Sequence, residues 1–182
     1  MIGKRTIFIL VMVSAGLLLW SICLAYGLKT GSLAPDFRVS SGEGKALSAK
    51  DIQGKAAGIF YETIDTVKQN IQLKAALGKY YDAEPEAVKK VIVRLPVINC
   101  AKVFLPLRGI YRSEFRKHSA LEGITIYADW TGKMFADYNI QEGASNVFLI
   151  DKKGVVRYYS FGKIEPQEVT KVVDLFKKLV EE

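Results

Sequence analysis

The segment GIFYETIDTVKQN, Gly58 to Asn70, decides the fold because its hydrophobic period changes half-way along its length. Residues 56–61 are continuously apolar, which is the pattern of a buried strand. Beyond them, apolar side chains recur at helical spacing, at Ile64, Val67, Ile71, Leu73, Leu77 and Tyr80. Asp65 or Thr66 is placed to cap the first turn of this helix. The segment therefore predicts a buried strand that runs directly into a helix.

The rest of the chain alternates strand and helix patterns around this junction. Further strands are expected at residues 36–39, 91–99, 124–127, 145–150 and 155–163, with a turn at 151–154 joining the last two as a hairpin. Further helices are expected at residues 83–90, 129–139 and 165–180, and residues 100–123 indicate an inserted loop with one short helix. Pro96 implies that its strand is an edge strand or carries a bulge. This order predicts an α/β protein, with a mixed sheet covered by helices on both faces.

The first 28 residues have a different character from the rest. Lys4 and Arg5 precede an uncharged, apolar run over residues 6–28, which predicts either a secretory signal peptide or an N-terminal membrane anchor. Positive charge on the N-terminal side of such a segment leaves the following chain outside the cytoplasm. We therefore expect residues 29–182 to be a single domain in the periplasm, either secreted or anchored to the outer face of the inner membrane.

Charge and cysteine content limit the classes of function. Without Lys4 and Arg5, the 26 basic residues fall to 24 against 19 acidic residues, a net charge of +5. A mildly basic body suits an anionic surface, and it equally suits an ordinary soluble protein. Export argues against nucleic acid as a partner. Cys23 lies in the apolar segment, so Cys100 is the single thiol of the body, and no internal disulfide is available there.

Three stretches together resemble the thioredoxin fold in its exported, redoxin or peroxiredoxin-like form. They are APDF at residues 34–37 continuing to LSAKDIQGKAAGIFY at 47–61, the segment from 134 to 164 that contains NVFLIDKKG, and the terminal helix. More narrowly, VINCAK, YRSEFRK and a D-W-x-G segment, in that order, are similar to the YtfJ-type family of small exported bacterial proteins. The resemblance implies a thioredoxin-like domain delivered to the periplasm. It does not imply a reaction.

The resemblance also shows where this chain departs from thioredoxin chemistry. That chemistry uses a Cys-x-x-Cys pair at the start of the helix after the strand, and a cis-proline that faces it. The corresponding positions here are Asp65 and Lys68, with Ser145 in place of the proline. We therefore expect a redox-inactive binding or accessory protein of the cell envelope, without a cofactor, whose partner is an envelope protein or an anionic surface.

The alternative is a thiol enzyme of the peroxiredoxin-like, antioxidant kind that uses Cys100. Arg94, Lys102 and Arg108 are near it in sequence, and positive charge around a thiol favours the reactive thiolate. The opposing interpretation is that a cysteine at a strand end is a small buried residue of the core. A reactive Cys100 would label rapidly in the native protein, whereas a core residue would label slowly.

Two further groups of charged residues are candidate binding sites. Arg108, Arg112 and Arg116 are spaced to form one basic stripe on a helix, which suits a phosphate, a lipid headgroup or an acidic partner protein. A solvated helix face explains the same spacing. Asp65, with Glu62 and Thr63 before it, could bind a metal or act as an acid, but a residue at a helix start is more often an N-cap. A metal would need two or more further ligands, and the lone His118 is distant in sequence, so no metal site is expected.

Overall fold

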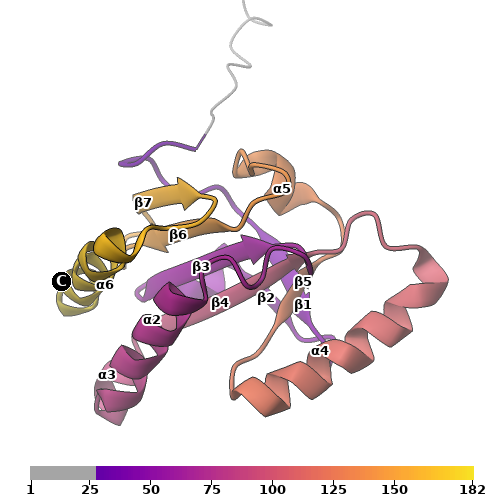
Figure 1. Cartoon of the computed structure of the whole chain (residues 1–182), viewed down its shortest axis with the longest axis horizontal. Helices are drawn as coiled ribbons and strands as arrows, with labels where there is room; N and C mark the ends of the chain where they lie inside the picture. Colours follow the sequence, from indigo (N-terminus) through magenta and orange to yellow (C-terminus); the bar gives the residue numbers. More distant parts are fainter. Residues whose placement is uncertain (1–27) are drawn as a thin grey trace, which may run out of the picture.

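The computed structural model describes residues 28–182, which contain one mixed sheet of seven strands (Figure 1). The strands are β1 Arg38–Ser41, β2 Ala46–Ser48, β3 Ala56–Glu62, β4 Ile92–Asn99, β5 Tyr127–Asp129, β6 Asn146–Ile150 and β7 Val156–Phe161. Their order across the sheet is β2-β1-β5-β4-β3-β6-β7. The central strands β3, β4 and β5 are parallel, and the outer pairs are antiparallel. The mixed sheet expected from the sequence is confirmed.

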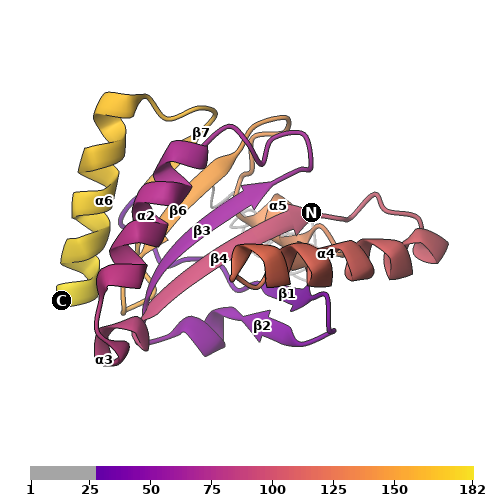
Figure 2. The same cartoon turned by 60° about the horizontal axis from the view of Figure 1, so that its bottom comes forward.

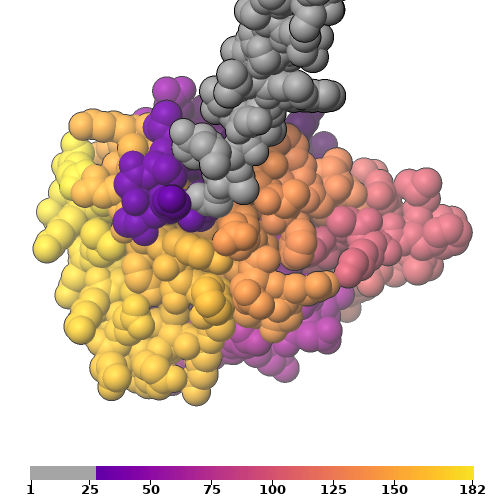
Figure 3. Space-filling model, turned by 90° about the horizontal axis from the view of Figure 1, so that it is seen from above, coloured from indigo at the N-terminus to yellow at the C-terminus, as the bar shows by residue number. Residues whose placement is uncertain are grey.

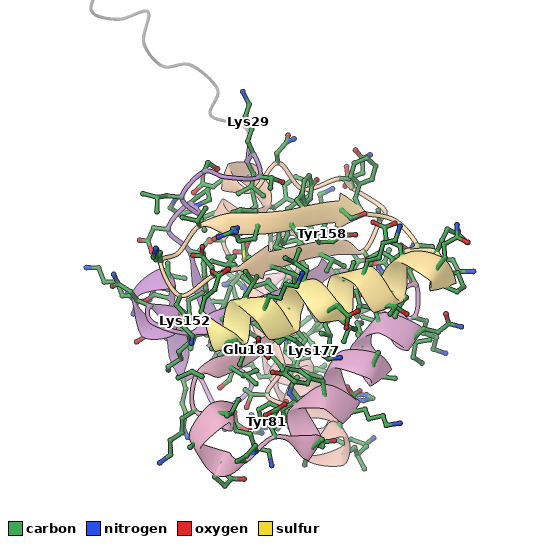
Figure 4. All side chains as sticks on the ribbon, turned by 90° about the vertical axis from the view of Figure 1, so that its left-hand side faces the viewer. Lys29, Tyr81, Lys152, Tyr158, Lys177 and Glu181 are labelled. Carbon is green, nitrogen blue, oxygen red and sulfur yellow. The ribbon has the colours of Figure 1, made fainter. Side chains whose placement is uncertain are left out.

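Helices cover both faces of this sheet. They are η2 Ala49–Ile52, α2 Ile71–Ala83, α3 Glu86–Lys89, η3 Leu105–Leu107, α4 Arg108–Glu122, α5 Lys133–Asp137 and α6 Pro166–Glu181. Figures 1 and 2 show α2, α4 and α6 on one side of the sheet and α5 on the other. On the first side, α2 and α6 pack against each other, and the hydroxyl of Tyr158 on β7 donates a hydrogen bond of 2.9 Å to Glu168 on α6 (Figure 4).

The strand β3 lies in the middle of this arrangement and divides two hydrophobic cores. Its residues alternate, so that Ile59 and Tyr61 pack in the core beneath α5, while Phe60 packs in the core beneath α2 and α6. All seven residues of the strand are buried. Glu62, two residues after Phe60, therefore lies on the side of α2. The alternation places a carboxylate, rather than an apolar group, next to the start of that helix.

The helix after β3 begins later than the sequence predicted. The sequence predicts its start at Asp65, whereas α2 begins at Ile71 and residues 64–70 form turns. The Oγ1 of Thr66 accepts a hydrogen bond of 2.9 Å from the backbone N–H of Thr63, and such local bonds compete with helix formation. As a result Ile64 and Ile71, expected on the buried stripe, are 58% and 62% exposed.

The inserted region also differs from its prediction. The short helix expected within residues 100–123 is a 15-residue helix, α4, because the side chain of Phe115 is buried against Trp130 and Cys100 and gives the helix an apolar face. The helix expected over residues 129–139 is shorter, since α5 covers only Lys133–Asp137.

Pro96 lies in an inner strand, but at a locally free edge. By strand order β4 is flanked by β3 and β5. However, β5 pairs only with residues 97–99 of β4, so Pro96 pairs with β3 alone. A proline is tolerated there because the missing N–H leaves no partner strand unsatisfied on the open side.

The beginning of the described chain lies along the last hairpin, as Figure 3 shows from above. Leu33 bridges Val155, and the backbone N–H of Ala34 donates a 2.8 Å hydrogen bond to the carbonyl of Gly154. The predicted signal peptide or anchor lies outside the described residues, except for its last residue, Leu28. Within residues 28–182, no helix has the length and apolar character needed to cross a bilayer.

Candidate functional site

A buried polar network occupies the junction between β3 and α2. Glu62, at the end of β3, is 1% exposed. Its Oε2 accepts a 2.6 Å hydrogen bond from the ammonium group of Lys74, one turn into α2, and its Oε1 accepts one of 2.6 Å from the hydroxyl of Ser145. Burial raises the pKa of Glu62, while Lys74 and then Ser145 act in the opposite direction. The junction therefore holds a buried carboxylate that is ion-paired with Lys74 and hydrogen-bonded by Ser145.

The hydroxyl of Ser145 is itself held by residues from distant parts of the chain. The Nδ2 of Asn70, just before α2, donates to the Ser145 hydroxyl at 3.0 Å and to the carbonyl of Gly162 at 2.9 Å. The Oδ1 of Asn70 accepts from the backbone N–H of Ile164 at 2.9 Å, and Gln69 accepts from that of Ser145 at 2.9 Å. The network thus ties the end of β3, the start of α2 and the residues flanking β6 and β7 together, and leaves little freedom at the junction.

Two hollows flank the network, and Glu62 and Tyr111 line both of them. The larger is a groove of 710 Å³ between α2 and α4, with Ile64, Val67, Ile71, Pro96, Ile98 and Ile110 among its lining residues. The smaller, of 390 Å³, lies on the other side of the junction and is lined in part by Thr63, Asn99, Leu107 and Ile140. A mostly apolar groove of this size beside a few converging polar groups has the dimensions of a ligand site.

Cys100 lies beneath α4 and has no exposed surface. It packs with Ile98, Phe115, Ile126 and Ala128 in a small third core. Burial raises the pKa of its thiol to about 12, the charge of Asp129 adds to this, and Arg108 opposes it. The other cations expected near it are engaged elsewhere, since Arg94 stacks on the ring of Tyr81 and Lys102 pairs with Glu142. This environment is that of an inert core thiol.

Solved structures with the same architecture identify the fold. A protein assigned as the thiol:disulfide interchange protein DsbE of Chlorobium tepidum superposes with a TM-score of 0.63 at 17% identity, over 85% of this chain and 99% of that one. A peroxiredoxin-like protein from Aquifex aeolicus gives 0.56 at 18% identity, over 84% and 88% of the two chains. The exposed lipoprotein thioredoxin of Streptococcus pneumoniae gives 0.54 at 18% identity, over 78% and 99%.

This chain has the thioredoxin fold. No protein-family model matches the sequence. A search of curated proteins likewise gives no match. The identity to the solved structures is below the level at which a shared fold implies a shared activity. The similarity to the YtfJ-type family therefore remains a prediction from the sequence.

Within the thioredoxin fold, the three predicted redox positions have different surroundings. Asp65 and Lys68 are exposed residues of the turn before α2, so neither stands at the N-terminus of that helix. Ser145 is buried and bonded to Glu62. The structure brings Ser145 together with Glu62, Lys74 and Asn70. Of these three, the sequence pointed only to Glu62, and only as a neighbour of Asp65. The available signal was an acidic residue that ends an otherwise apolar strand.

The D-W-x-G segment organises the turn that precedes α5. The carboxylate of Asp129 is fully buried. It accepts hydrogen bonds from four backbone N–H groups, those of Thr131, Gly132, Met134 and Phe135. It also accepts hydrogen bonds from two hydroxyl groups, those of Tyr61 and Thr131. Its oxygens are thereby fully used within the protein. Asp129 is a structural residue.

The arginine stripe of α4 faces the edge of the sheet. Arg108 lies over the ring of Trp130 at 5.2 Å and donates to its carbonyl at 3.3 Å, and Arg112 lies over the same ring at 5.7 Å. Arg116 donates to the carbonyl of Gly42 at 2.9 Å. The stripe thus fastens α4 to Trp130, directly after β5, and to the turn between β1 and β2. Anion binding by these arginines stays a prediction.

The lone histidine, His118, lies on α4 and is not part of the hydrogen-bond network at the junction of β3 and α2. His118 is exposed, and its ring nitrogens lie 3.9 Å from Glu114 and 4.0 Å from Glu122. Among residues 28–182 there is no group of three or more His, Cys, Asp or Glu side chains arranged to hold a metal ion.

Proposed function

We propose that this chain is an exported thioredoxin-fold protein without thiol–disulfide activity, which acts by binding another protein of the cell envelope. The observation that carries the proposal is the network of Glu62, Lys74 and Ser145. Proteins of this fold place their reactive thiol at the junction between this strand and the following helix. In this chain, the same junction is filled by a buried ion pair and its hydrogen bonds. A closed set of hydrogen bonds favours a fixed surface for recognition over a site that must exchange covalent partners.

The chemistry of thiol exchange supports the same proposal. Exchange needs a thiolate as nucleophile and a second thiol to resolve the mixed disulfide. Burial raises the pKa of the Cys100 thiol to about 12, so the thiolate is strongly disfavoured at neutral pH. Its sulfur also has no path to solvent, because the residue is 0% exposed.

The enzymatic part of the proposal is tested by insulin reduction. The purified body, residues 29–182, should produce no turbidity with insulin and dithiothreitol above the rate of dithiothreitol alone, because it lacks a vicinal thiol pair. A thioredoxin with an intact Cys-x-x-Cys motif serves as the positive control. Turnover comparable to that control would overturn the proposal.

The export part rests on the sequence and is supported by one structural neighbour, which is itself an exposed lipoprotein. A reporter phosphatase fused after Lys29 should be active only if the following chain lies outside the cytoplasm. A cytoplasmic reporter fused at the same position is the matched control and should be inactive. The reverse pattern would overturn the predicted orientation.

A further inference from the structure

The groove between α2 and α4 exposes more apolar surface than its neighbours. Ile64, Ile71 and Ile110 line it from both walls and are 58%, 62% and 61% exposed. A contiguous apolar surface of this kind on a soluble protein marks an interaction site, because its contact with water is unfavourable. Pro96 and Ile98 of β4 lie among the groove's lining residues between these walls.

The two walls carry different charges. On the α2 wall, Glu62 neutralises the ammonium group of Lys74 at 2.6 Å. Lys68, in the turn before α2, is an exposed cation that also lines the groove on this side. On the α4 wall, Glu114 and Glu122 both line the groove and are more than half exposed. Besides His118, Glu114 has Lys117 as a cationic neighbour, at 3.9 Å. In a body of net positive charge, this wall therefore presents carboxylates with unused capacity to bind a cation.

We propose that this groove receives an amphipathic helical segment of a partner protein, whose apolar side chains contact the isoleucines and whose basic side chain pairs with Glu114 or Glu122. The inference rests on the proposed binding function and names the partner of that site. A helix laid into an apolar groove buries residues at i, i+3, i+4 and i+7, and a flanking lysine or arginine then reaches the rim. A basic side chain on the side of the segment that faces α4 is therefore complementary to Glu114 and Glu122, whereas Lys68 repels one on the side that faces the turn before α2.

The test uses short synthetic peptides labelled with a fluorophore and read by anisotropy. The first peptide carries leucines at i, i+3, i+4 and i+7 with lysines on its flanks. The second has the same composition in scrambled order, and the third has glutamates in place of the lysines. We expect saturable binding of the first peptide alone, weakening as salt is added because the exposed carboxylates are screened.

Groove variants locate the binding. The double substitution Ile71→Ser with Ile110→Ser should weaken binding of the first peptide at least about tenfold, because it removes an apolar anchor from each wall. Glu114→Lys with Glu122→Lys should weaken it several-fold and reduce its salt dependence. Leu33→Ser is the matched control, since Leu33 is 71% exposed but bridges Val155 and does not line the groove. It should bind as the unmodified protein does.

Four results would overturn the inference. Binding that is unaffected by the isoleucine substitutions would place the peptide elsewhere. Equal binding of the glutamate peptide would show that the groove does not select a basic segment. Displacement of the first peptide by a neutral single-chain detergent would indicate a site for any apolar chain. A dimer that dissociates in the isoleucine variant, measured by sedimentation, would assign the groove to a second copy. The insulin assay on the same samples separates these failures from a failure of the proposed function, which would show as disulfide reduction.

Discussion

Replacing Lys74 by methionine would leave the carboxylate of Glu62 buried without its cation. Glu62 is 1% exposed, whereas the side chain of Lys74 is 28% exposed, so the carboxylate bears most of the consequence. Breaking a buried pair by removing one partner costs about 3–5 kcal/mol, and the partial exposure of Lys74 places the expected loss near the lower end, at about 3 kcal/mol. For a domain of this size, that corresponds to a fall in Tm of about 6–12 °C.

The loss of stability in Lys74→Met should depend on pH in a definite direction. Burial raises the pKa of Glu62 above its ordinary value of 4.5, and removing Lys74 removes the largest opposing influence, so the folded-state pKa rises further. A group whose pKa is raised by folding contributes stability that is fully present below its unfolded pKa and is lost as pH rises through the folded pKa. The stability deficit of Lys74→Met should therefore be largest at neutral pH and shrink as pH falls toward 4.5.

Urea unfolding followed by circular dichroism measures these free energies, provided that the slope with denaturant stays constant. Adding Glu62→Gln to Lys74→Met removes the buried charge, so it should recover much of the lost stability and abolish the pH dependence of the deficit. Lys102→Met is the matched control, because Lys102 and Glu142 form a pair that is 88% and 71% exposed, and it should cost less than about 1 kcal/mol. A Lys74→Met protein as stable as the unmodified one at neutral pH would refute the reasoning.

Three other expectations test the surrounding structure. Cys100 is fully buried, so it should react with a thiol reagent slowly in the native protein and rapidly in urea. Cys100→Ser should lower the free energy of unfolding by about 1–3 kcal/mol, because it buries a hydroxyl group. Fast labelling of the native protein, with an unchanged melting temperature for Cys100→Ser, would favour the thiol enzyme instead. Asp129→Ala should destabilise by at least about 2 kcal/mol in urea unfolding, because several backbone N–H groups, the buried one of Met134 among them, lose their acceptor. A smaller loss would contradict the structural role. Gly42→Ala should destabilise the protein, because a Cβ there would lie 2.7 Å from the carbonyl oxygen of Arg112. Gly109→Ala is its control, since the space around Gly109 is open, and in urea unfolding it should leave stability unchanged or raise it by up to about 1 kcal/mol.

The sequence by itself determined the elements whose patterns are local. The apolar run at residues 56–61 has the length and composition of a buried strand, and it is one. The hairpin of β6 and β7 and the final helix follow from period-2 and helical spacing around clear turn residues. Their order sufficed to predict a mixed sheet with helices on both faces, since few topologies accommodate it.

Where local hydrogen bonds compete with a helix, the same patterns misled. The spacing from Ile64 to Tyr80 indicated one continuous helix, but the hydroxyl of Thr66 bonds to the backbone at Thr63 and turns hold the chain until Ile71. Periodicity records which side chains share a face once a helix exists. It does not record whether a side chain offers the backbone another partner.

Only the tertiary structure decided what the junction contains. Ser145 is 83 residues from Glu62 in sequence, and no pattern near either residue predicts their 2.6 Å hydrogen bond. In the same way, the spacing of the arginines on α4 left open whether they face solvent, and the structure directs them to Trp130 and Gly42. The physical reason is shared: the ionisation and role of a polar side chain depend on the charges, donors and water that folding places around it.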